Sequence, residues 1–221
     1  MPNIYRCEFL GDDWGPWEGG QDMPPLPYDF VAEECTVSIS SRNQIEWCYA
    51  YDPGSGLISW CHLTEGFWSD WHQVTELSPP PNWDIDGIDA FFSVGTLEGK
   101  TVIYSYNPED CSLYFGRWNG RGFTEWEGEI SLEAPPNLSE ATDIFTAGDE
   151  DNSWMISVDL EEWSIFYTQW DEETEAFTMW EEAPPLDLPE EWLDMGVDID
   201  GDSRHGTFRL YATVYDEEDF D

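Results

Sequence analysis

The chain has 221 residues, of which 49 are Asp or Glu and 7 are Lys or Arg, so its formal net charge is −42 at pH 7. Such a charge repels nucleic-acid phosphates and anionic membrane surfaces, which excludes both as partners. Aromatic residues make up 16% of the chain, a content typical of a folded core and foreign to disordered acidic chains.

The N-terminal residues and the cysteines indicate a cytoplasmic protein. The start, MPNIYRCEFLGDDWG, lacks the basic and apolar regions of a secretory signal, and no apolar run in the chain is long enough to span a membrane. The cysteines form no C-x-x-C pair, which favours reduced thiols. Cys48 and Cys61 flank the DPGSG turn and could face each other, either as a disulfide or as a pair of packed thiols.

Four tryptophans stand in similar surroundings along the chain. Their spacings are 54, 55 and 54 residues, and a proline cluster follows each of them. A period of this length, made of four short strands, is typical of a β-propeller blade. The four are Trp17 in DDWGPWEGG, Trp71 in GFWSDWHQV, Trp126 in GFTEWEGEI and Trp180 in AFTMWEEAP.

Three complete units follow one another, and each alternates polar and apolar residues as half-buried strands do. Blade 1, about 28–76, contains CTVSIS, QIEWCYAY, GLISWCHL and FWSDWHQV. Blade 2, about 84–132, contains IDAFFSV, TVIYSYN, CSLYFGRW and FTEWEGEI. Blade 3, about 140–183, contains TDIFTAG, SWMISVDL, WSIFYTQW and AFTMWEE.

The last unit is expected to combine both ends of the chain. Residues 190–221 supply only two strands, LDMGVDI and TFRLYATVY, and NIYRCEFL and DDWGPWEG in residues 1–20 supply the missing two. This closure pairs the sheet edges that would otherwise stay open. The sequence therefore predicts a single all-β domain, a four-bladed β-propeller, in preference to a two-sheet sandwich.

Two sets of equivalent positions carry further expectations. Small residues at one third-strand position let adjacent sheets approach, so Cys7 and Cys61 are expected to be buried packing residues. At the start of the innermost strands stand Asp89, Asp143 and Asp194. They either form an axial ring of oxygens for a hard cation or ordered water, or cap backbone amides between blades. No other cofactor is expected.

The basic residues are few enough to be informative. No hydrolase, kinase, dinucleotide or metalloenzyme motif is present, so the sequence leaves open whether the chain is an enzyme. The composite unit concentrates four of the nine Arg and His residues beside aromatic residues, which predicts a ligand pocket with Arg209 as hydrogen-bond donor. Neutralisation of Asp198, Asp200 and Asp202 is the alternative. The predicted ligand-binding residues are Arg6, Trp14, Trp17, His205, Arg209 and Tyr211.

The repeated form, shown best by LYFGRWNGRGFTEWEG, resembles the blades of the fungal fucose-specific lectin family, which typically has six of them. This resemblance implies a propeller with sugar sites built from an Arg, a Glu on the next strand and a Trp or Tyr of the neighbouring blade. Arg209 in TFRLY matches the Arg position, while Arg6 stands where the family has Glu. Small propellers of this kind also resemble fungal biosynthetic proteins that confine a reactive polyene or quinone methide for a cycloaddition.

Two functions follow as expectations. The first is a lectin-like module whose Trp-lined pocket binds a sugar or another small ring compound. The second is a cofactor-free cyclase of fungal secondary metabolism, a pericyclase such as a hetero-Diels-Alderase, which needs confinement and one or two hydrogen-bond donors. Mimicry of DNA towards a basic protein groove is a third interpretation. The sequence leaves the oligomeric state open.

Overall fold

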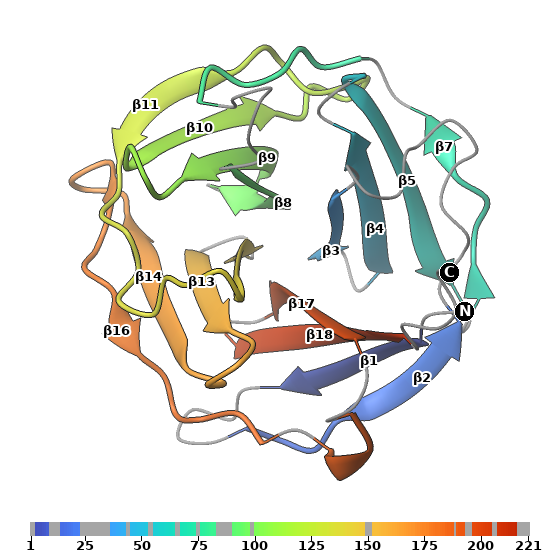
Figure 1. Cartoon of the computed structure of the whole chain (residues 1–221). Coiled ribbons are helices and arrows are strands. Elements are labelled where there is room, and N and C mark those ends of the chain that lie inside the picture. Colours follow the sequence, from blue (N-terminus) through green and yellow to red (C-terminus); the bar gives the residue numbers. More distant parts are fainter. Residues whose placement is uncertain are drawn as a thin grey trace.

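The computed structural model has four antiparallel sheets arranged around a central axis (Figure 1), which confirms the predicted four-bladed β-propeller. Within the described residues no helix is long and apolar enough to cross a membrane. The structure describes residues 3–8, 14–22, 36–42, 45–52, 55–64, 67–73, 76–82, 90–97, 100–148, 152–187, 189–192, 196–204 and 207–215.

Blades 1 to 3 each run along the chain from the axis to the rim. Blade 1 consists of β3 (Thr36–Arg42), β4 (Ile45–Asp52), β5 (Leu57–Thr64), β6 (Phe67–Trp68) and β7 (His72–Gln73). Blade 2 consists of β8 (Phe91–Leu97), β9 (Lys100–Asn107), β10 (Ser112–Arg117) and β11 (Glu127–Ser131). Blade 3 consists of β12 (Thr142–Gly148), β13 (Ser153–Asp159), β14 (Ile165–Asp171), β15 (Ala176–Phe177) and β16 (Glu181–Glu182).

The fourth sheet joins the two ends of the chain, as predicted. Its strand order is β17-β18-β1-β2, and Figure 1 shows the blue β1 beside the red β18. Arg6 pairs with Tyr211 in this antiparallel ladder, so the seam is made of backbone hydrogen bonds. We call this sheet the composite blade. It consists of β17 (Gly196–Arg204), β18 (Thr207–Tyr215), β1 (Asn3–Glu8) and β2 (Glu18–Asp22), and the 3-10 helix η1 (Glu190–Trp192) precedes it.

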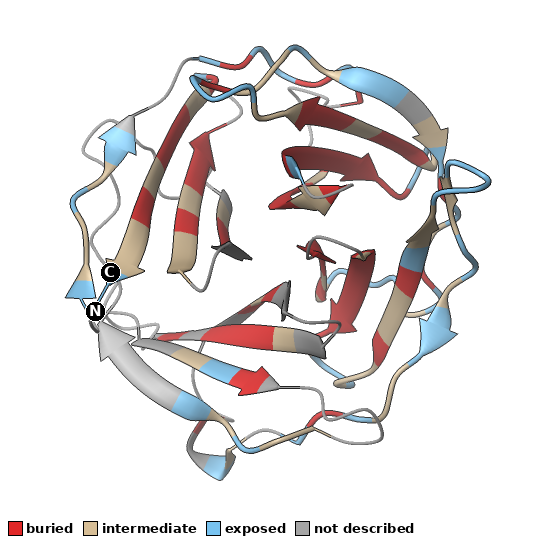
Figure 2. Ribbon diagram, turned by 180° about the vertical axis from the view of Figure 1, so that it is seen from behind, coloured by how far each residue is buried: buried red, intermediate tan, exposed pale blue. Residues whose placement is uncertain are grey.

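The innermost strands are linked around the axis by polar side chains. The Ser38 hydroxyl of β3 accepts a hydrogen bond from the amide of Val94 in β8 at 2.9 Å, and the Ser93 hydroxyl accepts one from the amide of Thr146 in β12 at 3.0 Å. In the composite blade a carboxylate does the same, because Asp200 accepts from the amide of Ile39 in β3. Buried residues concentrate on the inner strands (Figure 2). These bonds satisfy backbone donors that the blade contacts would otherwise leave unpaired.

Repeated tryptophans of blades 2 and 3 bind the linkers that enter their blades. The indole N–H of Trp126 donates to the carbonyl of Ser78 at 2.6 Å, and that of Trp180 donates to the carbonyl of Glu133 at 2.7 Å. Both carbonyls lie in the proline-rich stretches recognised in the sequence. The sequence period therefore reflects a shared scaffold contact.

Each of these two linkers also carries an asparagine whose side chain forms hydrogen bonds with strands of the blade that follows. The Asn82 amide donates to the carbonyls of Ser105 and Ser112 at 3.2 and 3.0 Å in blade 2. Asn137 does the same in blade 3, where it bonds the carbonyl of Ser164 at 2.8 Å and accepts from the Ser157 hydroxyl at 2.7 Å. In blades 2 and 3, an asparagine side chain therefore links the preceding linker to the sheet by hydrogen bonds.

The cysteines lie in packed surroundings, as expected for Cys7 and Cys61. Cys7, Cys48 and Cys61 are buried, and Cys48 lies directly opposite Cys61 on β4 and β5. None of these three cysteines forms a disulfide bond. Packing, and not a disulfide, is the role that the structure gives to the Cys48–Cys61 pair.

Candidate functional site

One row of side chains crosses the composite blade on the face turned towards blade 1. Arg6 on β1 lies opposite Tyr211 on β18 and opposite Glu18 on β2, and Tyr211 lies opposite Asp200 on β17. Residues directly opposite each other in an antiparallel sheet place their side chains on the same face. The row therefore runs from the axis to the rim.

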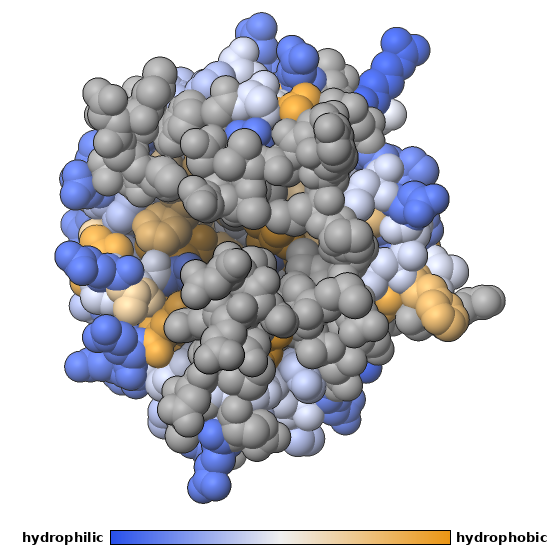
Figure 3. All heavy atoms as spheres, turned by 45° about the vertical axis from the view of Figure 1, so that its right-hand side comes forward, coloured by the Kyte–Doolittle hydropathy of each residue, from blue (hydrophilic) through white to orange (hydrophobic). Residues whose placement is uncertain are grey.

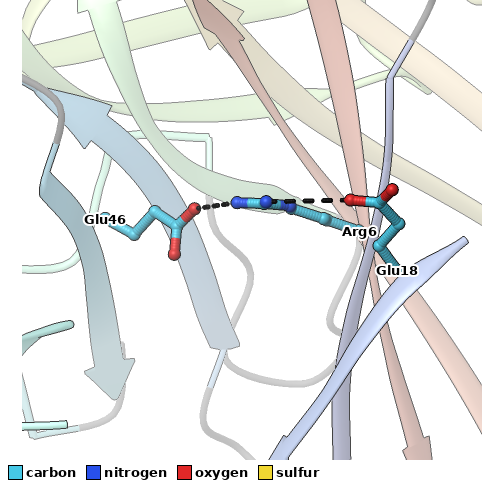
Figure 4. Close-up of polar contacts among 3 residues, drawn as sticks. All are labelled: Arg6, Glu18 and Glu46. Atoms are coloured by element: carbon cyan, nitrogen blue, oxygen red, sulfur yellow. Dashed lines mark hydrogen bonds and ion pairs between the residues drawn. The ribbon is translucent and has the colours of Figure 1, made fainter. Parts of the chain in front are cut away.

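Arg6 connects this row to blade 1 (Figure 4). Its Nη1 lies 3.1 Å from Oε1 of Glu46 on β4, and its Nη2 lies 3.9 Å from Oε2 of Glu18. The side chain of Arg6 is 49% exposed, whereas that of Glu46 is only 16% exposed. The guanidinium is therefore held between a carboxylate of its own blade and a more buried one of the next, with part of it open to solvent.

The inner part of this gap is apolar. Tyr211 packs with Ile39, Cys48 and Cys61 in one buried cluster. Glu46 and Cys48 lie two residues apart on β4, so their side chains point to the same face of the sheet. The charged groups therefore lie outside an apolar floor, which is the usual arrangement of a small-molecule site.

An indole completes the blade 1 side of the gap. Glu46 lies opposite Leu63 on β5, and Leu63 lies opposite Trp68 on β6, so the three form a row. The Trp68 Nε1 is buried and has no hydrogen-bond partner within the described part of the chain. A buried donor of this kind is uncommon, and a bound acceptor would satisfy it. Figure 3 brings the right-hand side of Figure 1 forward, and the described part of that face shows apolar areas among hydrophilic residues.

The predicted ligand-binding residues are divided between two faces of the composite blade. Arg6 and Tyr211 lie in the row described above, and Arg209, two residues before Tyr211, falls on the same face of β18. In the ladder Arg209 lies opposite Asp202 and Glu8. Ligand binding by Arg209 stays a prediction. His205 lies outside the described residues.

The two predicted tryptophans lie on the other side of this blade. The indole N–H of Trp14 donates to the carbonyl of Pro184 at 3.0 Å, and that of Trp17 donates to the carbonyl of Asp187 at 3.2 Å. Both pack against the core that the composite blade shares with blade 3, with the Trp17 and Trp192 ring centroids 5.1 Å apart. Neither tryptophan therefore meets Arg6 in one pocket.

The axial carboxylates show a capping contact. Asp143 on β12 accepts a hydrogen bond from the amide of Ile199 on β17 at 3.4 Å, which is the kind of contact that the capping interpretation predicts. Asp89 and Asp194 lie outside the described residues. Among the residues that are described, no group of three or more His, Cys, Asp or Glu side chains is placed to hold a metal ion.

Sequence reasoning did not pair Arg6 with Glu46 and did not single out Trp68. The sequence did contain a signal for Glu46. The run IEWCYAY in blade 1 contains an acid, whereas the equivalent runs TVIYSY and SWMISV contain none. The pairing itself depends on which faces of adjacent blades meet, and no local pattern in the sequence states that.

No protein-family model matches the chain, and no curated protein matches it. The resemblance to fucose-specific lectins therefore rests on sequence motifs and stays an expectation.

Proposed function

We propose that the protein is a lectin-like binding module that holds one sugar, or a similar polyhydroxylated ring compound, between the composite blade and blade 1. The observation that carries the proposal is the ion pair of Arg6 with Glu46, which joins the two blades at 3.1 Å and stays partly open to solvent. A guanidinium beside a carboxylate offers donors and acceptors together, as neighbouring hydroxyl groups require.

The charge balance favours a neutral ligand. Two carboxylates, Glu18 and Glu46, flank the single guanidinium of Arg6, and the whole chain carries −42. An anionic ligand would enter against this field, whereas a polyol exchanges hydrogen bonds without adding charge. The apolar floor of Tyr211 and the indole of Trp68 suit the C–H faces of a ring.

We expect only one site of this kind in the propeller, because no other blade has an arginine at the position equivalent to Arg6. Arg6 precedes Cys7, and the residues before the equivalent Cys61, Gly116 and Thr168 are aromatic. They are Trp60, Phe115 and Tyr167. A binding stoichiometry of one ligand per chain follows from the proposal.

The test is a screen of neutral and anionic sugars on a glycan array, followed by calorimetric titration of the hits. We expect neutral sugars to bind, and Arg6→Met and Glu46→Gln each to weaken binding at least tenfold, since each removes a charged hydrogen-bonding partner. Arg121→Met, at an exposed arginine of blade 2, is the matched control and should leave affinity unchanged. An inactive array with folded protein, or equal affinity of Arg6→Met and wild type, would overturn the proposal.

A cyclase is the second candidate. It needs an enclosure that confines the substrate and one or two hydrogen-bond donors. The gap between blades 1 and 2 favours it, because Trp47 there has a buried indole Nε1 without a partner among the described residues. Turnover of a polyene or quinone methide precursor, lost in Trp47→Phe, would support this function. An unchanged rate in that variant would contradict it.

A further inference from the structure

We infer that the gap between blades 1 and 2 is a second binding site, which takes an uncharged planar aromatic molecule carrying a hydrogen-bond acceptor. This inference is independent of the proposed sugar site and requires no turnover. It rests on three observations: the rings that line the gap, two buried polar atoms in it that have no partner within the described residues, and the lack of acids, lysines and arginines at the β4 and β5 positions that form its blade 1 wall.

The blade 1 side of the gap is a cluster of four rings. Trp47 on β4 lies opposite His62 on β5, and Trp60 on β5 lies opposite His72 on β7. The ring centroids of Trp47 and Trp60 are 4.9 Å apart, those of Trp47 and His62 are 5.2 Å apart, and those of Trp60 and His72 are 4.4 Å apart in a stacked arrangement. Two of the three histidines of the chain therefore lie against tryptophan rings of this cluster.

This ring cluster faces blade 2. Tyr51 lies four residues after Trp47 on β4 and so on the same face, and its ring packs at 5.0 Å against Phe92 of β8. The blade 2 side carries an aromatic pair of its own, Trp118 and Phe123, with centroids 5.3 Å apart. Phe123 packs against the core that the two blades share. The gap therefore has aromatic residues on both walls.

Two buried polar atoms in the ring cluster are unsatisfied. Trp47 Nε1 and His62 Nδ1 are both buried, and neither has a hydrogen-bond partner in the described part of the chain. Their residues lie directly opposite each other, so the two atoms belong to one place in the gap. Buried polar atoms normally find a partner, because leaving one unpaired costs free energy. The acceptor of a bound molecule is the partner we assign to the Trp47 N–H.

The strand positions on the blade 1 wall of this gap carry no acid, lysine or arginine, in contrast to the gap that holds Arg6. The facing positions of β4 and β5 around the cluster are Trp47, Tyr49, Tyr51, Trp60 and His62, and none is an acid, a lysine or an arginine. Burial, and the nearby carboxylate of Asp52, raise the pKa of Tyr51 well above its ordinary value, so this phenol stays neutral. In a chain with 49 acids, such a site selects against charged ligands by desolvation.

The site is tested with coumarin, a neutral planar two-ring compound whose carbonyl accepts hydrogen bonds. Naphthalene, of similar size and without an acceptor, is the matched ligand. Binding to the full chain is followed by ligand-observed NMR. We expect coumarin to bind at least tenfold more tightly than naphthalene, and Trp47→Phe to abolish this difference while keeping an aromatic ring in place.

Trp170→Phe is the matched control variant. Trp170 on β14 also has a buried Nε1 without a partner within the described residues. Its ring packs against Phe177, which lies opposite it on β15 and has no unsatisfied polar atom. This variant should bind coumarin as wild type does. Trp47→Phe without ligand should melt at the same temperature as wild type or higher, since it removes an unpaired buried donor.

His62→Phe provides a second variant should Trp47→Phe fail to fold, and it should weaken coumarin binding in the same direction. Equal binding of coumarin and naphthalene, no binding of coumarin to folded wild type, or equal losses in Trp47→Phe and Trp170→Phe would each overturn the inference.

Discussion

Blades 2 and 3 pack against each other through a shared hydrophobic core. The composite blade and blade 1, in contrast, also contact each other through charged side chains. Between blades 2 and 3, Leu97, Tyr104, Ile144 and Met155 belong to one buried cluster. Between the composite blade and blade 1, four of the described residues form the buried cluster, and Arg6 with its carboxylates lies outside it. The first junction is closely packed, whereas the second combines a smaller buried cluster with a partly exposed ion pair, which is where the proposed function places the ligand.

The close approach of β8 and β12 shows how tight the junction between blades 2 and 3 is. A Cβ atom added at Gly148 would lie 2.6 Å from the backbone oxygen of Thr96. The Thr146 hydroxyl donates to Ser93 across the same junction at 3.0 Å. Sheets can approach this closely only where one side chain is missing, so glycine is required there by space.

Removing residues 1–17 should have the largest effect. The remaining chain, 18–221, lacks β1, so β18 loses one of its two partner strands and β2 is cut from its sheet. We expect no cooperative thermal unfolding transition by circular dichroism. If amides of blades 2 and 3 stayed protected from hydrogen exchange, the junction between these blades would be stable without the composite blade. An unchanged melting temperature would contradict closure by both termini.

Gly148→Val should have the next largest effect, since its branched side chain meets the backbone of β8. Overpacking of this kind costs about 1–3 kcal/mol, which lowers the melting temperature by roughly 3–10 °C in a chain of this size. Differential scanning calorimetry measures it. Sugar binding between the composite blade and blade 1 should be unchanged in the folded fraction. A melting temperature equal to that of wild type would show that the junction between blades 2 and 3 is not close-packed.

Arg6→Met should lower the melting temperature by less than about 3 °C, because half-exposed ion pairs contribute little to stability. It retains much of the side-chain length and removes the charge between Glu18 and Glu46. The same variant loses sugar binding under the proposed function. A large drop in stability would instead make this ion pair a structural link between the two blades.

Asp159→Asn should have the smallest effect, and one that depends on pH. Backbone amides of Glu162 and Glu161 and the Ser139 hydroxyl donate to the Asp159 carboxylate, and together they hold its pKa below the ordinary value against the opposing effect of burial. A lowered folded-state pKa stabilises the protein above the unfolded-state pKa, and this gain is lost as the pH falls through the folded value. Urea unfolding should therefore show a deficit for the variant at pH 7 that shrinks below about pH 4. A deficit independent of pH would exclude the ionised carboxylate as its cause.

The sequence by itself determined the architecture. The spacing of Trp17, Trp71, Trp126 and Trp180 predicted the blade length, and the two short halves at the chain ends predicted the composite blade. Both inferences use only local patterns, strand alternation and repeat period, which the chain carries regardless of how the blades pack. The burial of Cys7 and Cys61 followed from the same alignment.

Only the tertiary structure decided which side chains meet. Trp14 and Trp17 are close to Arg6 in sequence, yet they pack towards blade 3, because successive strand residues point to opposite faces and each face of a blade meets a different neighbour. Arg6 instead meets Glu46, forty residues away in the sequence, across a blade junction. A contact between two blades depends on the twist and separation of both sheets, and this is a property of the closed ring rather than of any one strand.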